Sequence, residues 1–136
     1  MALPSVGGGR QIGDGNINEV ALITQSTPAT MTSTAALTIA QLVTGIVLGS
    51  PGSSAATYTL PTVALTEALL VNAKNDSAFD FSVINIDGSG SGVITMAVGT
   101  GWTLTGLVTI AATAGTAGHF RARKTGTGTW TCYRLS

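Results

Sequence analysis

The sequence contains few charged residues. Asp, Glu, Lys and Arg make up 9% of its 136 residues and cancel to a formal net charge of zero, whereas charged residues make up about 25% of an average soluble domain. A protein that binds nucleic acid through its overall charge needs many Lys and Arg side chains to release counterions, so we expect no nucleic-acid partner. Mean hydropathy is +0.42, which is the opposite of the apolar-poor composition of a disordered chain.

Cysteine and long apolar runs are also scarce. Cys132 is the only cysteine, which excludes an internal disulfide, a cysteine-based zinc site and an iron–sulfur cluster. Polar residues interrupt every apolar run before it reaches the ~18 residues of a membrane span, so we expect no membrane partner. The N-terminal residues lack the basic start and apolar segment of a signal peptide, so we expect synthesis in a host cytoplasm.

Candidate catalytic and metal-binding residues are few. His119 is the only histidine, and residues 88–136 contain no acid that could orient it as a general base. The aspartates within residues 76–87 lack the spacing of a calcium loop. The glycine-rich segment 88–92 precedes an expected strand, whereas a phosphate loop must open a helix. We therefore expect neither an enzyme nor a bound metal or other cofactor.

Short apolar runs rich in threonine and separated by glycine-containing turns dominate the rest of the sequence. Alternation of apolar and polar residues at the period of a half-buried strand is seen in 57–60 and 79–83, and residues 93–98 and 102–105 are expected as further short strands. The strand pattern ends at Thr62, which is a suitable N-cap for a helix. Leucine and alanine recur near helical spacing after it. We expect a mainly β protein, an antiparallel sandwich or barrel, whose only helix lies near residues 63–73.

The first 19 residues differ from the remainder. Five glycines and Pro4 disfavour regular structure there. Arg10, Ile12 and Ile17 are the residues with which such a segment could contact a neighbour. We expect an extended N-terminal arm over residues 1–19, which straps to another subunit, and a single domain over residues 20–136.

A C-terminal β-hairpin is the clearest single element, with strands near 118–124 and 129–135. Its basic residues are Arg121, Arg123, Lys124 and Arg134. With a turn at residues 126–127, Arg123 faces Trp130, a cation–π contact worth ~0.5–1 kcal/mol. Two interpretations of the basic residues stay open. They form a patch for an acidic partner, or they pair with Asp and Glu from the first half of the chain within the same fold.

Five segments give the chain a family resemblance: YTLPT at 58–62 leading into the helix, FDFSVIN at 79–85, GTGW at 99–102, FRARKTG at 120–126 and WTCYR at 130–134. The chain resembles the small Thr-, Gly- and Ala-rich virion proteins of tailed bacteriophages, especially capsid decoration (cement) and head-fibre proteins. The resemblance implies a β-sandwich or jelly-roll-like domain, often trimeric, that binds the major capsid protein on the outer surface of the head. It would hold neighbouring capsid subunits together against the outward pressure of packaged DNA, with many weak contacts adding up through multivalency.

Other functions predict features that can be looked for in the structure. A phage tail or fibre module that binds a host glycan needs exposed aromatic side chains, and Trp102 and Trp130 are the best candidates. A hydrolase or lyase needs clustered acids or a His–acid pair. A subunit of a cell-surface appendage needs an export signal, which the N-terminal residues lack.

Overall fold

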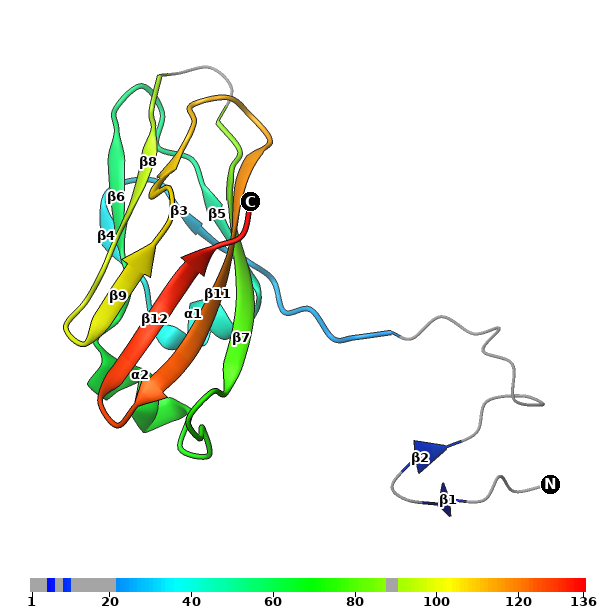
Figure 1. Cartoon of the computed structure of the whole chain (residues 1–136). Helices are drawn as coiled ribbons and strands as arrows, with labels where there is room; N and C mark the ends of the chain where they lie inside the picture. The colour runs from blue at the N-terminus through cyan, green and yellow to red at the C-terminus, as the bar shows by residue number, and fades with distance from the viewer. Residues whose placement is uncertain (1–4, 7–8, 11–21, 88–90) are drawn as a thin grey trace.

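The computed structural model describes residues 5–6, 9–10, 22–87 and 91–136 of the chain (Figure 1). The protein is mainly β, with two larger sheets that lie against each other and two short helices at one end. The six-stranded sheet has the order β3 (Ala29–Met31), β5 (Ile46–Gly49), β7 (Ala78–Asn85), β11 (Thr116–Gly126), β12 (Thr129–Arg134) and β9 (Trp102–Thr105). The four-stranded sheet has the order β10 (Thr109–Ile110), β8 (Ile94–Ala97), β6 (Ala56–Thr59) and β4 (Ala35–Ala36).

Both sheets are mixed, so the expectation of an antiparallel fold is wrong. From β3 to β11, consecutive strands alternate between the two sheets. The chain therefore crosses from one layer to the other at each connection, and β3, β5 and β7, like β4, β6 and β8, run parallel. The glycine-containing turns that suggested hairpins within one sheet are mostly corners between sheets. Among the described strands, the antiparallel pairs are β7–β11, β11–β12, β8–β10 and the small β1–β2 pair.

The described residues form two short helices, where one was expected. α1 (Ile39–Val43) begins with a capping box, in which the Thr38 hydroxyl accepts from the backbone N–H of Gln41 and the Gln41 side chain accepts from the backbone N–H of Thr38. α2 (Val63–Leu69) begins at the Thr62 N-cap, as the sequence predicts. It ends at Leu69 and not at residue 73, because the backbone of Leu70 leaves the helical region (φ −93°, ψ 58°).

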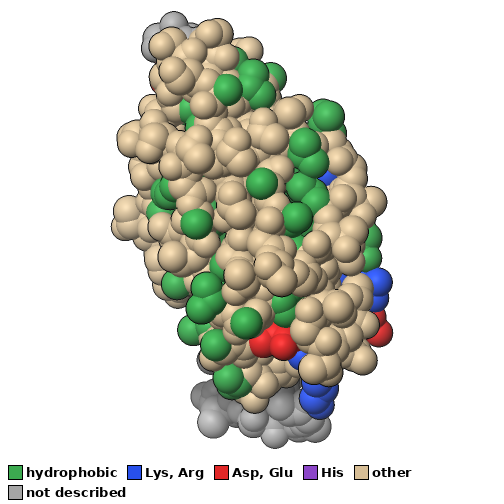
Figure 2. Space-filling view, turned by 90° about the vertical axis from the view of Figure 1, so that its left-hand side faces the viewer, with side chains coloured by type: hydrophobic (Ala, Val, Ile, Leu, Met, Phe, Trp, Pro, Cys, Tyr) green, Lys and Arg blue, Asp and Glu red, His purple; other side chains and the backbone are tan. Residues whose placement is uncertain are grey.

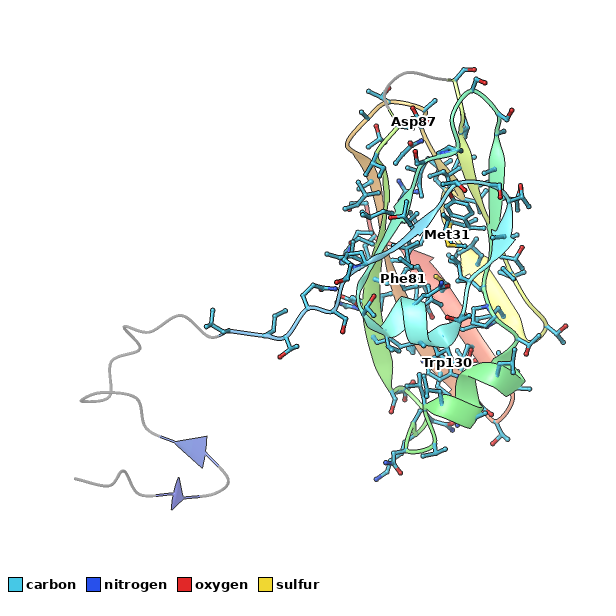
Figure 3. The ribbon with its side chains drawn as sticks, turned by 180° about the vertical axis from the view of Figure 1, so that it is seen from behind. Met31, Phe81, Asp87 and Trp130 are labelled. Atoms are coloured by element: carbon cyan, nitrogen blue, oxygen red, sulfur yellow. The ribbon has the colours of Figure 1, made fainter. Side chains whose placement is uncertain are left out.

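One hydrophobic core fills the space between the sheets. Figure 3 shows Phe81 and Trp130 in this interior, with Trp130 nearer the helices. The rings of Phe81 and Phe120 stack with centroids 5.3 Å apart, and those of Trp102 and Trp130 lie 5.5 Å apart. This aromatic cluster belongs to the six-stranded sheet, and Tyr58 faces it from the four-stranded sheet.

Three buried polar groups connect the layers. The Tyr58 hydroxyl donates to the Met31 carbonyl oxygen (2.9 Å), which joins β6 to β3. The indole N–H of Trp102 donates to the carbonyl oxygen of Pro61 (2.7 Å). Asn85 occupies the inward position at the end of β7, and its amide donates to the carbonyl oxygens of Gly92 and Ala111 (3.0 Å each).

The C-terminal hairpin forms where expected, with a register one residue away from the expected one. Lys124 and not Arg123 lies opposite Trp130, because Thr125 is bulged and the turn is Thr127–Gly128, with Gly128 at φ 74°. Trp130 consequently points into the core. Arg123 instead lies over the ring of Tyr133, with its guanidinium carbon 5.9 Å from the ring centroid.

The N-terminal segment is described only in part. β1 (Ser5–Val6) and β2 (Gly9–Arg10) pair with each other. Ile12 and Ile17 lie outside the described residues, so the expected arm over residues 1–19 stays a prediction. No helix in the described part of the chain is long and apolar enough to cross a membrane.

Candidate contact surfaces

The outward face of the six-stranded sheet carries three charged side chains, those of Asp80, Arg121 and Arg123. Arg121 lies directly opposite Asp80 in the β7–β11 register. Its Nε and Nη2 atoms donate to the two carboxylate oxygens at 2.6 and 2.9 Å, a bidentate geometry. The hydrogen bonds from Arg121 lower the pKa of Asp80, and the positive charge of the guanidinium lowers it further. This pair joins the two central strands of the sheet.

Arg123 is the second basic residue on this face. It contacts Asp76 Oδ1 through Nη1 at 2.5 Å and the Tyr133 hydroxyl through Nε at 3.1 Å. Asp76 belongs to the turn that precedes β7, where its backbone has φ 70°. The hairpin and the preceding turn are therefore tied together through one guanidinium.

Lys124 and Arg134 occupy the inward side of the hairpin, so the four basic residues do not share one face. Lys124 Nζ lies 3.2 Å from Glu67 Oε1 on α2 and donates to the Ala73 carbonyl oxygen at 3.1 Å. Arg134 donates to the carbonyl oxygens of Leu107 and Thr109 at 3.2 and 3.1 Å. Its guanidinium carbon lies 5.2 Å from the centroid of the buried Phe120 ring.

Glu67 has further donors besides Lys124. It accepts from the indole N–H of Trp130 at 3.2 Å and from the backbone N–H of Gly128 at 3.3 Å. Partial burial acts to raise the pKa of Glu67, but these three donors outweigh it, so the pKa is lowered. Of the two interpretations of the basic residues, the structure therefore shows the second for Arg121, Arg123 and Lys124, which pair with acids of the first half of the chain.

A His–acid pair that the sequence did not reveal lies on the same outer face. The Ser82 hydroxyl is 2.9 Å from His119 Nδ1, and Asp80 Oδ2 is 3.5 Å from His119 Nε2. These residue types resemble a hydrolytic triad, yet Asp80 is already committed to Arg121. The backbone N–H groups of Ser82 and His119 donate to Gly45 and Ser136 carbonyl oxygens, so neither can bind an oxyanion. The group is a polar cross-strand cluster.

Cys132 does not lie beside His119 and cannot act as a nucleophile for it. Cys132 points into the core, on the side of β12 opposite to the outer face that carries His119. Burial raises the pKa of its thiol to about 12, so it stays protonated at neutral pH.

The outward face of the four-stranded sheet carries no charged side chain on the strands themselves. The register aligns Thr57, Thr95 and Thr109 in one row across β6, β8 and β10. A second row, two residues along, contains Ala36, Thr59 and Ala97. Figure 2 shows this side of the molecule, where hydrophobic side chains are scattered among uncharged ones and most of the visible acidic and basic side chains lie near the lower end. Small uncharged side chains on a regular sheet give a flat surface.

Apolar side chains are exposed around α2, at the helical end of the molecule. Leu65 is 60% exposed, Leu69 50% and Val71 74%. Leu65 and Val98 form the rim of a groove of about 600 Å³, which lies between the N-termini of α1 and α2 and whose floor is made by Leu37, Ile39, Leu60 and Pro61. On the other side of α2, Leu69 to Ala73 line a smaller hollow of about 320 Å³ against Phe79 and Trp130.

The two tryptophans are not available as ligand platforms. Trp102 is 6% exposed and Trp130 1%, and both belong to the core. Groups of three or more His, Cys, Asp or Glu that could hold a metal ion are absent from the described ranges. A comparison with known protein families, with curated proteins and with solved structures finds no match.

Proposed function

We propose that this chain is a structural virion protein, which decorates and cements the outer surface of a tailed-phage capsid by bridging neighbouring capsid subunits. The observation that carries the proposal is the contrast between the two outer faces. One holds ion pairs that are closed within the chain, and the other is a flat surface of Thr and Ala side chains without charge. Such a surface can be covered by another protein without burying an unpaired charge.

The threonine row is suited to a protein interface. For the hydroxyls of Thr57, Thr95 and Thr109, the described residues provide no hydrogen-bond partner. Their methyl groups contribute apolar area, and each hydroxyl can donate and accept once a partner arrives. Many such weak contacts, repeated over a capsid lattice, give high overall avidity.

The finer details of the proposal come from the family resemblance. The two sheets that face each other would be a jelly-roll-like β-sandwich, residues 1–19 an arm, and the assembled form a trimer. Arg10, Ile12 and Ile17 of the arm would contact the major capsid protein or a sister subunit. The hairpin residues Arg121, Arg123, Lys124 and Arg134 would add further contacts to the partner. The first three are already paired with acids and Arg134 donates to backbone carbonyl oxygens, so these contacts would not depend on a free positive charge.

A glycan-binding tail or fibre module is the second candidate. It needs aromatic faces in a groove, and burial removes both tryptophans from this role. The partly exposed Tyr133, held by Arg123, is the aromatic residue that remains on the outer face.

The first test is the copy number of the chain in purified particles of the phage that encodes it, measured by mass spectrometry against the major capsid protein. A fixed ratio close to one-to-one, or a simple fraction of it, is the expected result. A few copies per particle would identify a tail or fibre component, and absence from particles would reject a virion role altogether.

A pair of matched variants tests the contact face itself. Thr95→Glu places a carboxylate at the centre of the uncharged face, whereas Thr131→Glu makes the same change on the outer face of the six-stranded sheet, opposite Arg123. We expect occupancy of decoration-free capsids to fall at least roughly tenfold for Thr95→Glu and to stay unchanged for Thr131→Glu. Equal occupancy for the two variants would contradict the assignment of this face.

A further inference from the structure

We infer that the segment Leu22 to Pro28 of one copy binds in the groove between α1 and α2 of a second copy, so that copies of this chain associate head to tail. This inference concerns the isolated protein and does not rest on the proposed capsid function. It joins an exposed apolar segment and an apolar groove, neither of which is covered by another of the described residues.

The first feature is an exposed apolar segment. Leu22 is 89% exposed and Ile23 88%, the highest values among the large apolar side chains of the described residues. The segment belongs to no helix or strand, and Figure 1 shows it running away from the two sheets before it enters β3. Two neighbouring large side chains left in water are a cost that docking against an apolar surface removes.

The second feature is the groove of about 600 Å³. Its floor consists of side chains that are at least nine-tenths buried, among them Leu37 and Leu60, and its rim consists of Leu65 and Val98, which are 60% and 41% exposed. No other described side chain fully covers these two rim residues. The groove is therefore wide enough and apolar enough to accept side chains the size of leucine and isoleucine.

Charge favours a copy of the same chain as the occupant. Residues 20–66 contain no Asp, Glu, Lys or Arg, and this range holds the segment and most of the groove. The remaining groove residues, Val98 to Thr100, are uncharged as well. Docking thus buries no charge on either side, and nothing in the groove selects for the acidic or basic partner that a charged rim would attract.

The backbone offers a further contact at the same place. Ala35 and Ala36 of β4 pair with β6 on one side, and the described strands leave the other edge of β4 open. Ala36 also lines the groove. An extended segment can add to an open edge through main-chain hydrogen bonds while its side chains enter the adjacent pocket. Every copy carries one segment and one groove, so the contact is heterologous and closes into a ring if the rotation between copies allows it.

The experiment measures self-association of the full chain by sedimentation velocity over a concentration series. The segment variant is Leu22→Ser with Ile23→Ser, and the groove variant is Leu65→Glu. The groove variant keeps α2 intact, because Glu three residues after the Thr62 N-cap completes a capping box. The control is Leu107→Ser, since Leu107 is 65% exposed and lines neither the groove nor the segment.

We expect the wild type and the control to associate with the same dissociation constant, and the segment and groove variants to associate at least roughly tenfold more weakly. Mixing the two variants is the decisive step. One retains its groove and the other its segment, so the mixture should form one-to-one pairs that neither variant forms alone.

Several results would overturn the inference. These are a wild type that stays monomeric at every concentration, a segment variant that associates like the wild type, a control that loses association as well, or a mixture without pairs. Docking of the segment into the groove of its own chain would also appear as a monomeric wild type. Because the assay contains no capsid, its outcome is separate from that of the capsid-occupancy test.

Discussion

The outer faces of the two sheets differ in how the chain uses charge. On the six-stranded sheet, Asp80 and Arg121 lie opposite each other on adjacent strands, and their charges are satisfied before any partner arrives. On the four-stranded sheet, Thr57, Thr95 and Thr109 align without a charge among them. The comparison shows that basic residues clustered in a sequence can be paired with acids from a distant part of the same chain. The uncharged face still offers the hydroxyls of Thr57, Thr95 and Thr109, which have no hydrogen-bond partner among the described residues.

The largest loss of folding stability is expected for a substitution at Asn85, because this side chain connects the two sheets that carry the two outer faces. Asn85→Ala removes the buried amide that donates to the carbonyl oxygens of Gly92 and Ala111, and so breaks one buried and one part-buried hydrogen bond. We expect the free energy of unfolding to fall by about 2–4 kcal/mol. Urea denaturation measures it. Asn72→Ala, the same change at an exposed position, should stay within about 0.5 kcal/mol. Equal losses would mean that Asn85 does not join the layers.

A smaller effect should separate the two faces directly. Asp80→Lys replaces an ion pair with like charges beside Arg121, so we expect a loss of about 1–2 kcal/mol in the free energy of unfolding. Thr95→Lys adds the same side chain to the uncharged face, where no charge opposes it, and should cost less than about 0.5 kcal/mol. Thermal and urea unfolding of the two variants give the difference. If Thr95→Lys is the more destabilised, the contrast between the faces does not hold.

The smallest change in folding stability is expected when low pH protonates Asp80. The pKa of Asp80 in the folded protein lies below its unfolded value of about 3.9, because Arg121 donates hydrogen bonds to its carboxylate. The ion pair therefore contributes its full stability above about pH 4, and this contribution is lost as the pH falls through the folded pKa. We expect Asp80→Asn to be less stable than the wild type at pH 7, and the two to converge near pH 2. A constant difference across this range would show that the carboxylate charge contributes nothing.

Local signals in the sequence predicted local structure well. The Thr62 N-cap, the C-terminal hairpin and the strands near 79–83 and 102–105 are all confirmed. α1 was missed although a signal was present. Thr38 and Gln41 have the spacing of a capping box, but the expectation of a single helix near residues 63–73 left this signal unused.

The non-local features could not be read from the sequence. Strand alternation between two sheets produces the same apolar periodicity as hairpins in one sheet, because only inward and outward positions are encoded. The ion pairs between Arg or Lys and an acid join residues separated by more than forty positions, such as Asp80 and Arg121. The sequence therefore shows which acids are available but not which base each one pairs with. The hairpin register was off by one because a single bulged residue, Thr125, changes which residues face each other.

The edge position of β9 has a consequence for how the protein folds. β9 joins the six-stranded sheet through β12 alone, and Trp102 pairs with Trp130 across that junction. The edge strand must wait until a much later part of the chain has found its place, and pairing over such separations is slow. The chain's only two tryptophans lie 5.5 Å apart at this point. Their fluorescence in a refolding experiment will therefore report the pairing of β9 with β12, and we expect it to change after the local β11–β12 hairpin has formed.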